Sequence, residues 1–311
     1  MHSDPEPLAP PQLSLLVCTR GRSAQLARLF ASLESQSLRD FEVVLVDQNE
    51  PGVLDDIVAR HRGRLRIDHV RSLPGLSRAR NVGLARCRAP LVAFPDDDCW
   101  YRPALVEEVV RLFAQHPEAD ALMGRSIDAQ GRESLGAFLK SDQAIGRRNV
   151  WSAGNSNTLF VRRTAAEAVG GFDETLGVGA ATPFRSGEET DFLLRILRQD
   201  RAVIFRHALT VHHDQVGNQG RHKRASDYAR GFGRVLRLHR YGLPYLGLRL
   251  ARFTASGARA LLRGDARTAL DKALWAVGTA AGFFAALPGS AGRVPGGAPS
   301  WRFRAGVTRG G

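Results

Sequence analysis

Three consecutive carboxylates, Asp96, Asp97 and Asp98, follow the apolar run Pro90–Phe94. Adjacent carboxylates repel one another, so their charges are costly unless water or a bound cation compensates them. Carboxylate oxygens are the ligands that Mg²⁺ and Mn²⁺ prefer, and either ion could bridge to a diphosphate. The triplet therefore indicates a divalent-cation site, and the alternative is a solvated turn that caps the following helix.

Two further polar clusters stand at or near the ends of apolar runs. Asp47 closes the run FEVVLVD, where nucleotide-binding sheets place an acidic residue that receives a ribose. The alternative for Asp47 is a plain turn or helix-capping residue. His212, His213 and Asp214 follow a shorter apolar run, and histidines beside an aspartate could contact a metal or a phosphate. A purely structural role is the alternative for these histidines.

Three acidic residues, Glu188, Glu189 and Asp191, open an amphipathic helix that the pattern predicts over 189–199. The helix dipole alone favours acids in a first turn, and a general base that deprotonates a hydroxyl is the functional alternative. Successive helical residues are separated by about 100°. Glu188 and Asp191 should therefore share one face, while Glu189 points elsewhere.

A second helix signal lies in the segment GLSRARNVG, residues 75–83. Ser77 is a suitable N-cap, and a helix N-terminus attracts phosphate. Arg78 and Arg80 could add charge-assisted hydrogen bonds to a diphosphate, or could be solvated on a surface helix. The sequence contains neither GxGxxG nor GxxxxGK[ST], so a dinucleotide fingerprint and a P-loop are excluded.

Alternating strands and helices would position these residues. Apolar runs predict strands at 13–19, 41–47, 65–70 and 90–94, and helical spacing predicts helices at 23–35, 52–60, 76–87 and 102–115. Further strands are expected at 119–124, 157–162 and 202–205. The alternation predicts an α/β protein with a parallel sheet and right-handed crossovers. Ligands of such sheets lie outside the carboxyl ends of the strands, where Asp47 and the triplet would meet.

The order and spacing of these segments over residues 13–215 resemble the family 2 glycosyltransferases of the GT-A fold. The segments that carry the resemblance are LVCTRGR, FEVVLVDQNE, GLSRARNVGLARCRAPLVAFPDDD, GNSNTLFVRR, GGFDE, GEETDFLLR and VHHD. The resemblance implies a Rossmann-like α/β domain over 13–220, with a mixed, mostly parallel sheet flanked by helices.

The resemblance also implies roles for individual residues. Thr19 and Asp47 would hold the nucleoside, and Arg22, Arg80 and Asp97 would complete the donor-binding site.

The metal ligands and the base follow from the same resemblance. Asp96 and Asp98 would form the DxD element and His213 would join them in holding Mg²⁺ or Mn²⁺, with Asp98 as the direct ligand. The family's base is usually the aspartate of a Glu-Asp pair, and this chain has Glu189 at that position. Either Glu189 acts as a longer base or Asp191 has taken the role.

The activity that the resemblance implies is metal-dependent transfer, with inversion, from a nucleoside-diphosphate sugar to a hydroxyl of a glycan or polyprenyl-linked acceptor. Bacterial surface polysaccharide assembly would be its setting. A nucleotidyltransferase on a similar sheet is one alternative, although TRGRS is a poor match to its phosphate loop. A non-enzymatic nucleic-acid-binding protein is the other, and no RRM, zinc-finger or OB signature supports it. No nucleic-acid partner is therefore expected.

Positive charge is concentrated in the last third of the chain. Residues 201–311 carry 19 Lys/Arg and four Asp/Glu, whereas residues 1–200 carry 25 and 27. This asymmetry predicts an anionic partner, and an anionic membrane surface fits a peripheral protein on the cytoplasmic face of the inner membrane. Three cysteines without a CxxC pair also favour a reducing cytoplasm.

The remaining segments predict the domain limits. Residues 1–12 are expected to be a flexible lead-in, 221–290 a basic helical region and 291–311 a disordered tail. The uncharged run 273–287 is shorter than the roughly 20 apolar residues of a membrane span, so an interfacial or core helix is expected there.

Overall fold

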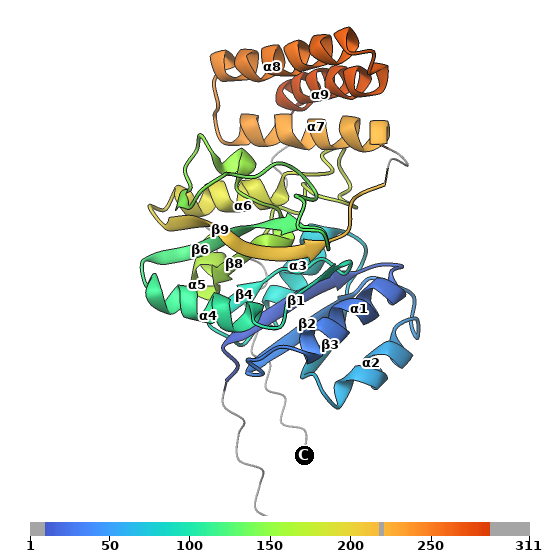
Figure 1. Cartoon of the computed structure of the whole chain (residues 1–311), viewed down its shortest axis with the longest axis vertical. Coiled ribbons are helices and arrows are strands. Elements are labelled where there is room, and N and C mark those ends of the chain that lie inside the picture. Colours follow the sequence, from blue (N-terminus) through green and yellow to red (C-terminus); the bar gives the residue numbers. More distant parts are fainter. Residues whose placement is uncertain (1–9, 218–220, 287–311) are drawn as a thin grey trace, which may run out of the picture.

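The computed structural model describes residues 10–217 and 221–286, which form a helix-flanked sheet and a stack of three further helices (Figure 1). The predicted tail 291–311 and most of the predicted lead-in 1–12 lie outside the described residues. The strands are β1 (Leu13–Thr19), β2 (Phe41–Asp47), β3 (Ile67–Arg71), β4 (Leu91–Ala93), β5 (Cys99–Trp100), β6 (Ala119–Ile127), β7 (Gln143–Ala144), β8 (Leu159–Arg162) and β9 (Ala202–His213). The α-helices are α1 (Ser23–Glu34), α2 (Asp55–Arg62), α3 (Leu76–Leu84), α4 (Leu105–Gln115), α5 (Arg163–Ala168), α6 (Glu188–Leu197), α7 (Arg221–Leu238), α8 (Leu243–Leu262) and α9 (Ala266–Phe284). Two short 3₁₀ helices are η1 (Val150–Ser152) and η2 (Ser156–Thr158).

One mixed sheet forms the centre, with the strand order β3-β2-β1-β4-β8-β6-β9-β5 and β7 paired to β9. The pairs β1–β2, β2–β3, β1–β4 and β6–β9 are parallel, and β8 runs antiparallel to both β4 and β6. The predicted α/β class, with a mixed, mostly parallel sheet flanked by helices, is confirmed.

The sheet is buried on both faces, which explains the uninterrupted apolar runs of its central strands. Successive side chains of a strand point to opposite faces. Leu13, Leu15 and Val17 of β1 accordingly pack with α1 and α4, whereas Leu16 packs with α3 and α6. The apolar runs could therefore locate β1 and β2 to the residue.

The strand β9 is longer than predicted, because a register shift interrupts its apolar pattern and its second half was not predicted. Pairing with β6 shifts register between Phe205 and Thr210, where a Cβ at Gly124 would collide with the backbone of Leu209. The apolar pattern stops at this shift, although the strand continues to His213. The histidine pair therefore lies within β9, and the prediction that it follows the strand is wrong.

The start of α3 also differs from its prediction. The N-cap is Gly75, whose φ of 134° suits glycine, and Ser77 is buried inside the helix with its hydroxyl donating to the carbonyl oxygen of Leu176 at 2.7 Å. The backbone N–H of Leu76 donates to the carbonyl of Val178. The segment around Leu176 thus covers this helix end, and Ser77 is not the N-cap that was predicted.

Three helices, α7, α8 and α9, stack at one end of the molecule, with α7 nearest the sheet (Figure 1). Glycines allow the close approach of α7 and α9, since a Cβ at Gly233 or Gly282 would collide with the backbone of the other helix. The predicted helix at 273–287 lies in α9 and packs through this interface, as far as the structure describes it. In the described part of the chain, no helix has the length and hydropathy needed to cross a membrane.

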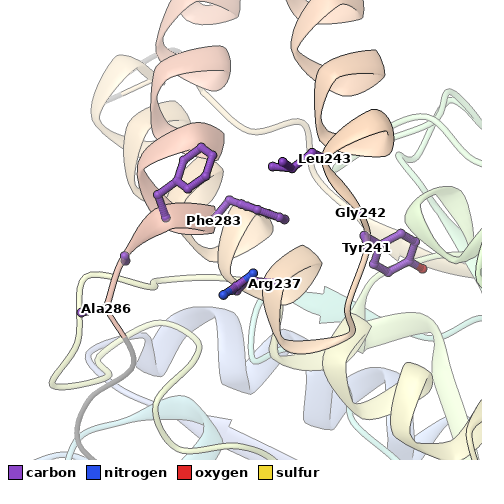
Figure 2. Close-up of a pocket in the computed structure, with 8 residues that line it drawn as sticks. Arg237, Tyr241, Gly242, Leu243, Phe283 and Ala286 are labelled. Atoms are coloured by element: carbon purple, nitrogen blue, oxygen red, sulfur yellow. The ribbon is translucent and has the colours of Figure 1, made fainter.

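An open hollow of about 550 Å³ lies where α7 ends, α8 begins and α9 ends (Figure 2). Its lining is mainly apolar and includes Leu243, Phe283 and Phe284 together with Arg237. None of its lining residues comes from the carboxyl end of a β-strand, so this hollow is separate from the candidate site described next.

Candidate active site

The carboxyl ends of three neighbouring strands bring the predicted donor-site residues together. Thr19 at the end of β1 is the register partner of Asp47 at the end of β2. On the other side of β1, Cys18 bridges to Asp96, which follows β4. Sheet pairing alone therefore places the acidic triplet beside Thr19 and Asp47.

Asp47 has a fixed orientation at this carboxyl edge of the sheet. Its carboxylate is buried and accepts hydrogen bonds from the backbone and side-chain amides of Asn49, both at 2.8 Å. The ring of His69 on β3 lies 3.2 Å from its other oxygen. The sequence did not predict the His69 contact, because it follows from the β2–β3 register rather than from a local motif.

Arg22, just beyond β1, joins two members of the triplet. Its guanidinium donates to Asp97 at 3.1 Å and forms a second ion pair with Asp98. Burial raises the pKa of Asp97 above its usual value, against the lowering effects of the Thr19 hydroxyl and of Arg22. About half of the Arg22 side chain is exposed, so its charge faces both the acids and the open edge of the sheet.

Asp98 pairs with His213 across the β5–β9 ladder. Cys99, next to Asp98, is the register partner of His213, and the Nε2 of His213 lies 3.1 Å from the Asp98 carboxylate. Burial acts to raise the pKa of Asp98, but the hydrogen bond and charge of His213, together with Arg22, lower it overall. The Nδ1 of His213 lies 2.5 Å from the carbonyl oxygen of Asp214, which fixes the ring orientation.

A buried guanidinium links the third acid of the triplet to α6. Arg80 on α3 is almost fully buried, with Glu188 at 3.2 Å and Asp96 at 3.8 Å. Burial raises the pKa of Asp96 to about 6, although Arg80 opposes this shift. The hydroxyl of Ser156, from the segment GNSNT, lies 3.4 Å from Asp96. Arg80 therefore acts here as the counter-ion of two acids, and Arg78 instead pairs with Glu174 on the surface.

The residues of this edge fit a divalent-cation site in which the protein supplies some of the ligands and the substrate supplies the others. Within the described residues, no group of three or more His, Cys, Asp and Glu side chains is already gathered around one point. Asp98 and His213 are gathered, and the second ring nitrogen of His213 has the carbonyl contact typical of a metal-ligating histidine. Mg²⁺ is usually held by one or two carboxylates together with substrate phosphates. The third predicted ligand, Asp96, lies with Arg80 instead.

The first turn of α6 separates its acids as the helical spacing predicted. Glu188 and Asp191 are buried on one face, while Glu189 is partly exposed. Asp191 accepts from Arg195 and His239, each at 2.8 Å, so both of its oxygens are engaged. Burial acts to raise the pKa of Asp191, but the charges of Arg195 and His239 outweigh it and lower the pKa.

Glu189 has the electrostatic setting of a general base. Burial and the charge of Glu188 raise the pKa of Glu189 to about 8, while Arg80 opposes the shift and Asp96 adds to it. Glu188, the neighbour of Glu189 in the chain, forms an ion pair with Arg80, whose guanidinium also lies 3.8 Å from Asp96. A base is most effective when its pKa lies near the working pH, and a raised carboxylate pKa meets that condition.

Comparison with known proteins agrees with this geometry. Residues 14–158 match the family model described as Glycosyl transferase family 2. A protein of Mycobacterium tuberculosis named pre-mycofactocin glycosyltransferase is 28% identical over 214 residues, which are 65% of this chain and 42% of that protein. The chain thus spans less than half the length of this relative.

Solved structures share the architecture. Mannosyltransferase PcManGT from Pyrobaculum calidifontis, solved with GDP-Man and Mn²⁺, is similar with a TM-score of 0.62 at 16% identity, covering 91% of this chain and 90% of that chain. S. aureus TarS 1-349, solved with UDP-GlcNAc, is similar with a TM-score of 0.56 at 16% identity, covering 87% and 91%. At these identities the likeness shows a common fold, GT-A.

Proposed function

This chain belongs to glycosyltransferase family 2, and on that premise we propose that it transfers a sugar from a nucleoside-diphosphate sugar to a hydroxyl of an acceptor. The observation that carries the proposal is the setting of Glu189. It is the partly exposed acid of the α6 first turn, and burial with the charge of Glu188 raises its pKa to about 8.

The donor occupies the carboxyl edge of the sheet in this proposal. Asp47, oriented by Asn49 and His69, receives the nucleoside beside Thr19. Arg22 is half exposed next to Asp97 and Asp98, so it can turn toward the diphosphate and neutralise part of its charge. A divalent cation held by Asp98 and His213 would stabilise the negative charge of the departing diphosphate.

Glu189 accepts the proton of the acceptor hydroxyl as that oxygen attacks the sugar carbon, and the configuration of that carbon inverts in a direct displacement. Glu188 and Arg80, paired at 3.2 Å, act in opposite directions on the pKa of Glu189, which Glu188 raises and Arg80 lowers. Asp191 positions α6 rather than reacting, because its two oxygens are engaged by Arg195 and His239. Of the two predicted alternatives, Glu189 is therefore the base that we propose.

The acceptor that we propose is a glycan or a polyprenyl-linked sugar at the cytoplasmic face of the inner membrane, in bacterial surface polysaccharide assembly. Support comes from the outer face of α8, where Leu248, Arg252, Arg259 and Leu262 are exposed at helical spacing. This face joins cations to apolar side chains, as an interfacial helix on anionic lipid requires.

A donor screen tests the proposed activity. The full chain is incubated with Mn²⁺ and each of UDP-glucose, UDP-GlcNAc, GDP-mannose and dTDP-rhamnose, with octyl glycosides as acceptors. We expect release of the nucleoside diphosphate from one donor and a new glycoside by mass spectrometry. Release of pyrophosphate from a nucleoside triphosphate and a sugar phosphate, with no turnover of any sugar nucleotide, would show a nucleotidyltransferase instead.

A further inference from the structure

The ladder that brings Asp98 and His213 together is short. Strand β5 contributes Cys99 and Trp100, and it stands at one end of the strand order of the sheet. Its register pairs Cys99 with His213 and Trp100 with His212. Strands usually have roughly 3–10 residues, so a ladder of two residue pairs is a weak support for the 3.1 Å contact between Asp98 and His213.

Arg28 on α1 contacts both strands of this ladder. Its guanidinium lies over the ring of Trp100, with the guanidinium carbon 3.4 Å from the ring centroid. The same guanidinium donates to the carboxylate of Asp214, the residue after β9, at 2.7 Å. Trp100 in turn stacks on His212, with ring centroids 5.2 Å apart and ring planes at 15°. One residue of α1 therefore ties β5 to the end of β9.

Each contact of Arg28 acts close to a proposed metal ligand. Trp100, which lies against the guanidinium, is two residues after Asp98 in the chain. Asp214 accepts from Arg28 through its side chain, while its backbone carbonyl oxygen lies 2.5 Å from the Nδ1 of His213. The guanidinium thus supports the strand next to the carboxylate and the residue whose carbonyl orients the imidazole.

We propose that Arg28 is a positioning residue, which holds Asp98 and His213 at the separation that a divalent cation requires. Arg28 acts through its neighbours and not by touching the cation. The inference rests on the metal site of the proposed function, and it gives His212 a role as the ring on which Trp100 stacks. Loss of a group that orients metal ligands typically costs about 10–100-fold in metal affinity or activity.

Two other roles for Arg28 make different predictions. The side chains of Arg28 and Asp214 are 47% and 66% exposed, and exposed ion pairs contribute little to stability, so the free energy of unfolding should change little when Arg28 is replaced. A role through charge alone predicts tighter metal binding, because removal of a positive charge favours a cation nearby. Weaker metal binding with an intact fold is therefore the sign of positioning.

The test measures binding of Mn²⁺ to the full chain, with no substrate present, by electron paramagnetic resonance of the free ion. Arg28→Ala is compared with Arg111→Ala, a matched change at an exposed arginine of α4 that donates to Gln115. Urea unfolding checks the fold of both variants. We expect Arg28→Ala to raise the Kd for Mn²⁺ about tenfold or more, and Arg111→Ala to leave it within about twofold.

Two further variants define the cause of the effect. Arg28→Lys keeps the positive charge and can pair with Asp214, but it lacks the planar group that stacks on an indole. Its Kd for Mn²⁺ should therefore lie between those of the wild type and Arg28→Ala. Asp98→Asn removes a proposed ligand and should abolish the binding, which assigns the measured ion to this site.

A Kd for Arg28→Ala equal to that of Arg111→Ala, or lower, would overturn the inference, as would a wild type that binds no Mn²⁺. A wild type that binds Mn²⁺ but turns over no sugar nucleotide would instead refute the proposed transfer. The two claims fail separately, because the positioning test measures the bound ion and the donor screen measures the product.

Discussion

Two carboxylate–imidazole pairs differ in burial, and this difference suits one pair to bind a ligand and the other to stabilise the fold. Asp98 and His213 meet at the open carboxyl edge, with the aspartate side chain 23% exposed. Asp191 and His239 meet between α6 and α7, and both side chains are at most 3% exposed. The first pair can take a ligand, because its aspartate is open to solvent. The second pair is closed by Arg195 and serves to hold α6 in place.

The Asp98–His213 pair should control metal-dependent turnover. Asp98→Asn removes one charged oxygen ligand, and a metal supplies several kcal/mol of stabilisation to the leaving group, so we expect turnover to fall by about 100-fold or more. EDTA should have the same effect on the wild type. Asp56→Asn, an exposed acid on α2, serves as the control in the same nucleoside-diphosphate release assay and should behave as wild type. Full wild-type activity in EDTA would contradict the metal assignment.

The Asp191–His239 pair should control stability in a pH-dependent way. Because the folded state lowers the pKa of Asp191, the stabilisation is present above the unfolded value of about 3.9 and is lost as the pH falls through the folded value. Asp191→Asn should therefore reduce the free energy of unfolding by about 1.5–3 kcal/mol at pH 7, the range for hydrogen bonds to charged groups. Urea unfolding at pH 7 and pH 3.5 measures the difference. A deficit that does not shrink at pH 3.5 would refute the ionic origin.

The apolar pattern of the sequence predicts the limits of strands that are buried on both faces. It does not predict the limits of strands where the sheet is irregular. β1 and β2 have the predicted limits, since all of their positions except the partly buried Cys18 are buried. The two-residue strand β5 has too few residues for a pattern, and β9 loses its pattern at the register shift. Asp98 and His213 could be proposed from motifs, but their 3.1 Å contact depends on this unpredicted β5–β9 pairing.

Contacts to the C-terminal helices also could not be predicted from the sequence. The hydroxyl of Ser186, just before α6, donates to the backbone carbonyl of Tyr228 on α7, and no sequence motif connects these two segments. The separation of Glu189 from Glu188 and Asp191 did follow from the sequence, because three residues within one helical turn have fixed relative directions. Local geometry was therefore predictable, and contacts between distant segments were not.

The docking of α7 on α6 should depend on Gly231. Gly231→Ala places a Cβ against the backbone of Ser186, which cannot rotate away, so we expect a loss of about 1–3 kcal/mol in the free energy of unfolding. Gly247→Ala on α8 is the matched control, because no atom lies within 4 Å of the added Cβ. That control should gain about 0.5–1 kcal/mol from helix propensity. Equal effects of the two substitutions in urea unfolding would contradict the packing account.

In the whole molecule, the exposed arginines and leucines of α8 lie apart from the acidic edge of the sheet. The acidic edge lies at the sheet, while α8 and α9 form the layer farthest from the sheet (Figure 1). Leu261 and Leu262 at the end of α8 are 62% and 88% exposed, close in sequence to Arg259 and Arg263. The proposed binding to anionic lipid rests on these exposed leucines and arginines at the end of α8.

Reversing charge on α8 should weaken binding to anionic lipid. Each Arg near such a surface is worth roughly 1 kcal/mol, so Arg252→Glu with Arg259→Glu should lower binding to phosphatidylglycerol vesicles by more than about tenfold. Arg60→Glu with Arg62→Glu makes the same change of net charge on α2 and should bind nearly as the wild type does. Co-sedimentation with vesicles measures both. Equal sedimentation of the two double variants would assign any binding to net charge alone and refute a role for α8.

If Glu189 is the base of a glycosyl transfer, turnover should depend on pH, because burial and the charge of Glu188 raise its pKa to about 8. The base must be deprotonated, so wild-type kcat should rise as the pH increases from 6 through 8 and then level off. Glu189→Gln removes the proton acceptor but retains the shape of the side chain, and Glu118→Gln, a surface change, is its control.

The most direct test measures binding and turnover of the sugar nucleotide in parallel for the wild type, Glu189→Gln and Glu118→Gln. We expect Glu189→Gln to bind the donor with a Kd within about twofold of wild type by calorimetry, while transfer falls by about 100-fold or more at pH 8. Glu118→Gln should be unchanged in both. Near-wild-type transfer by Glu189→Gln would contradict the claim, and the proton acceptor would then have to be another group.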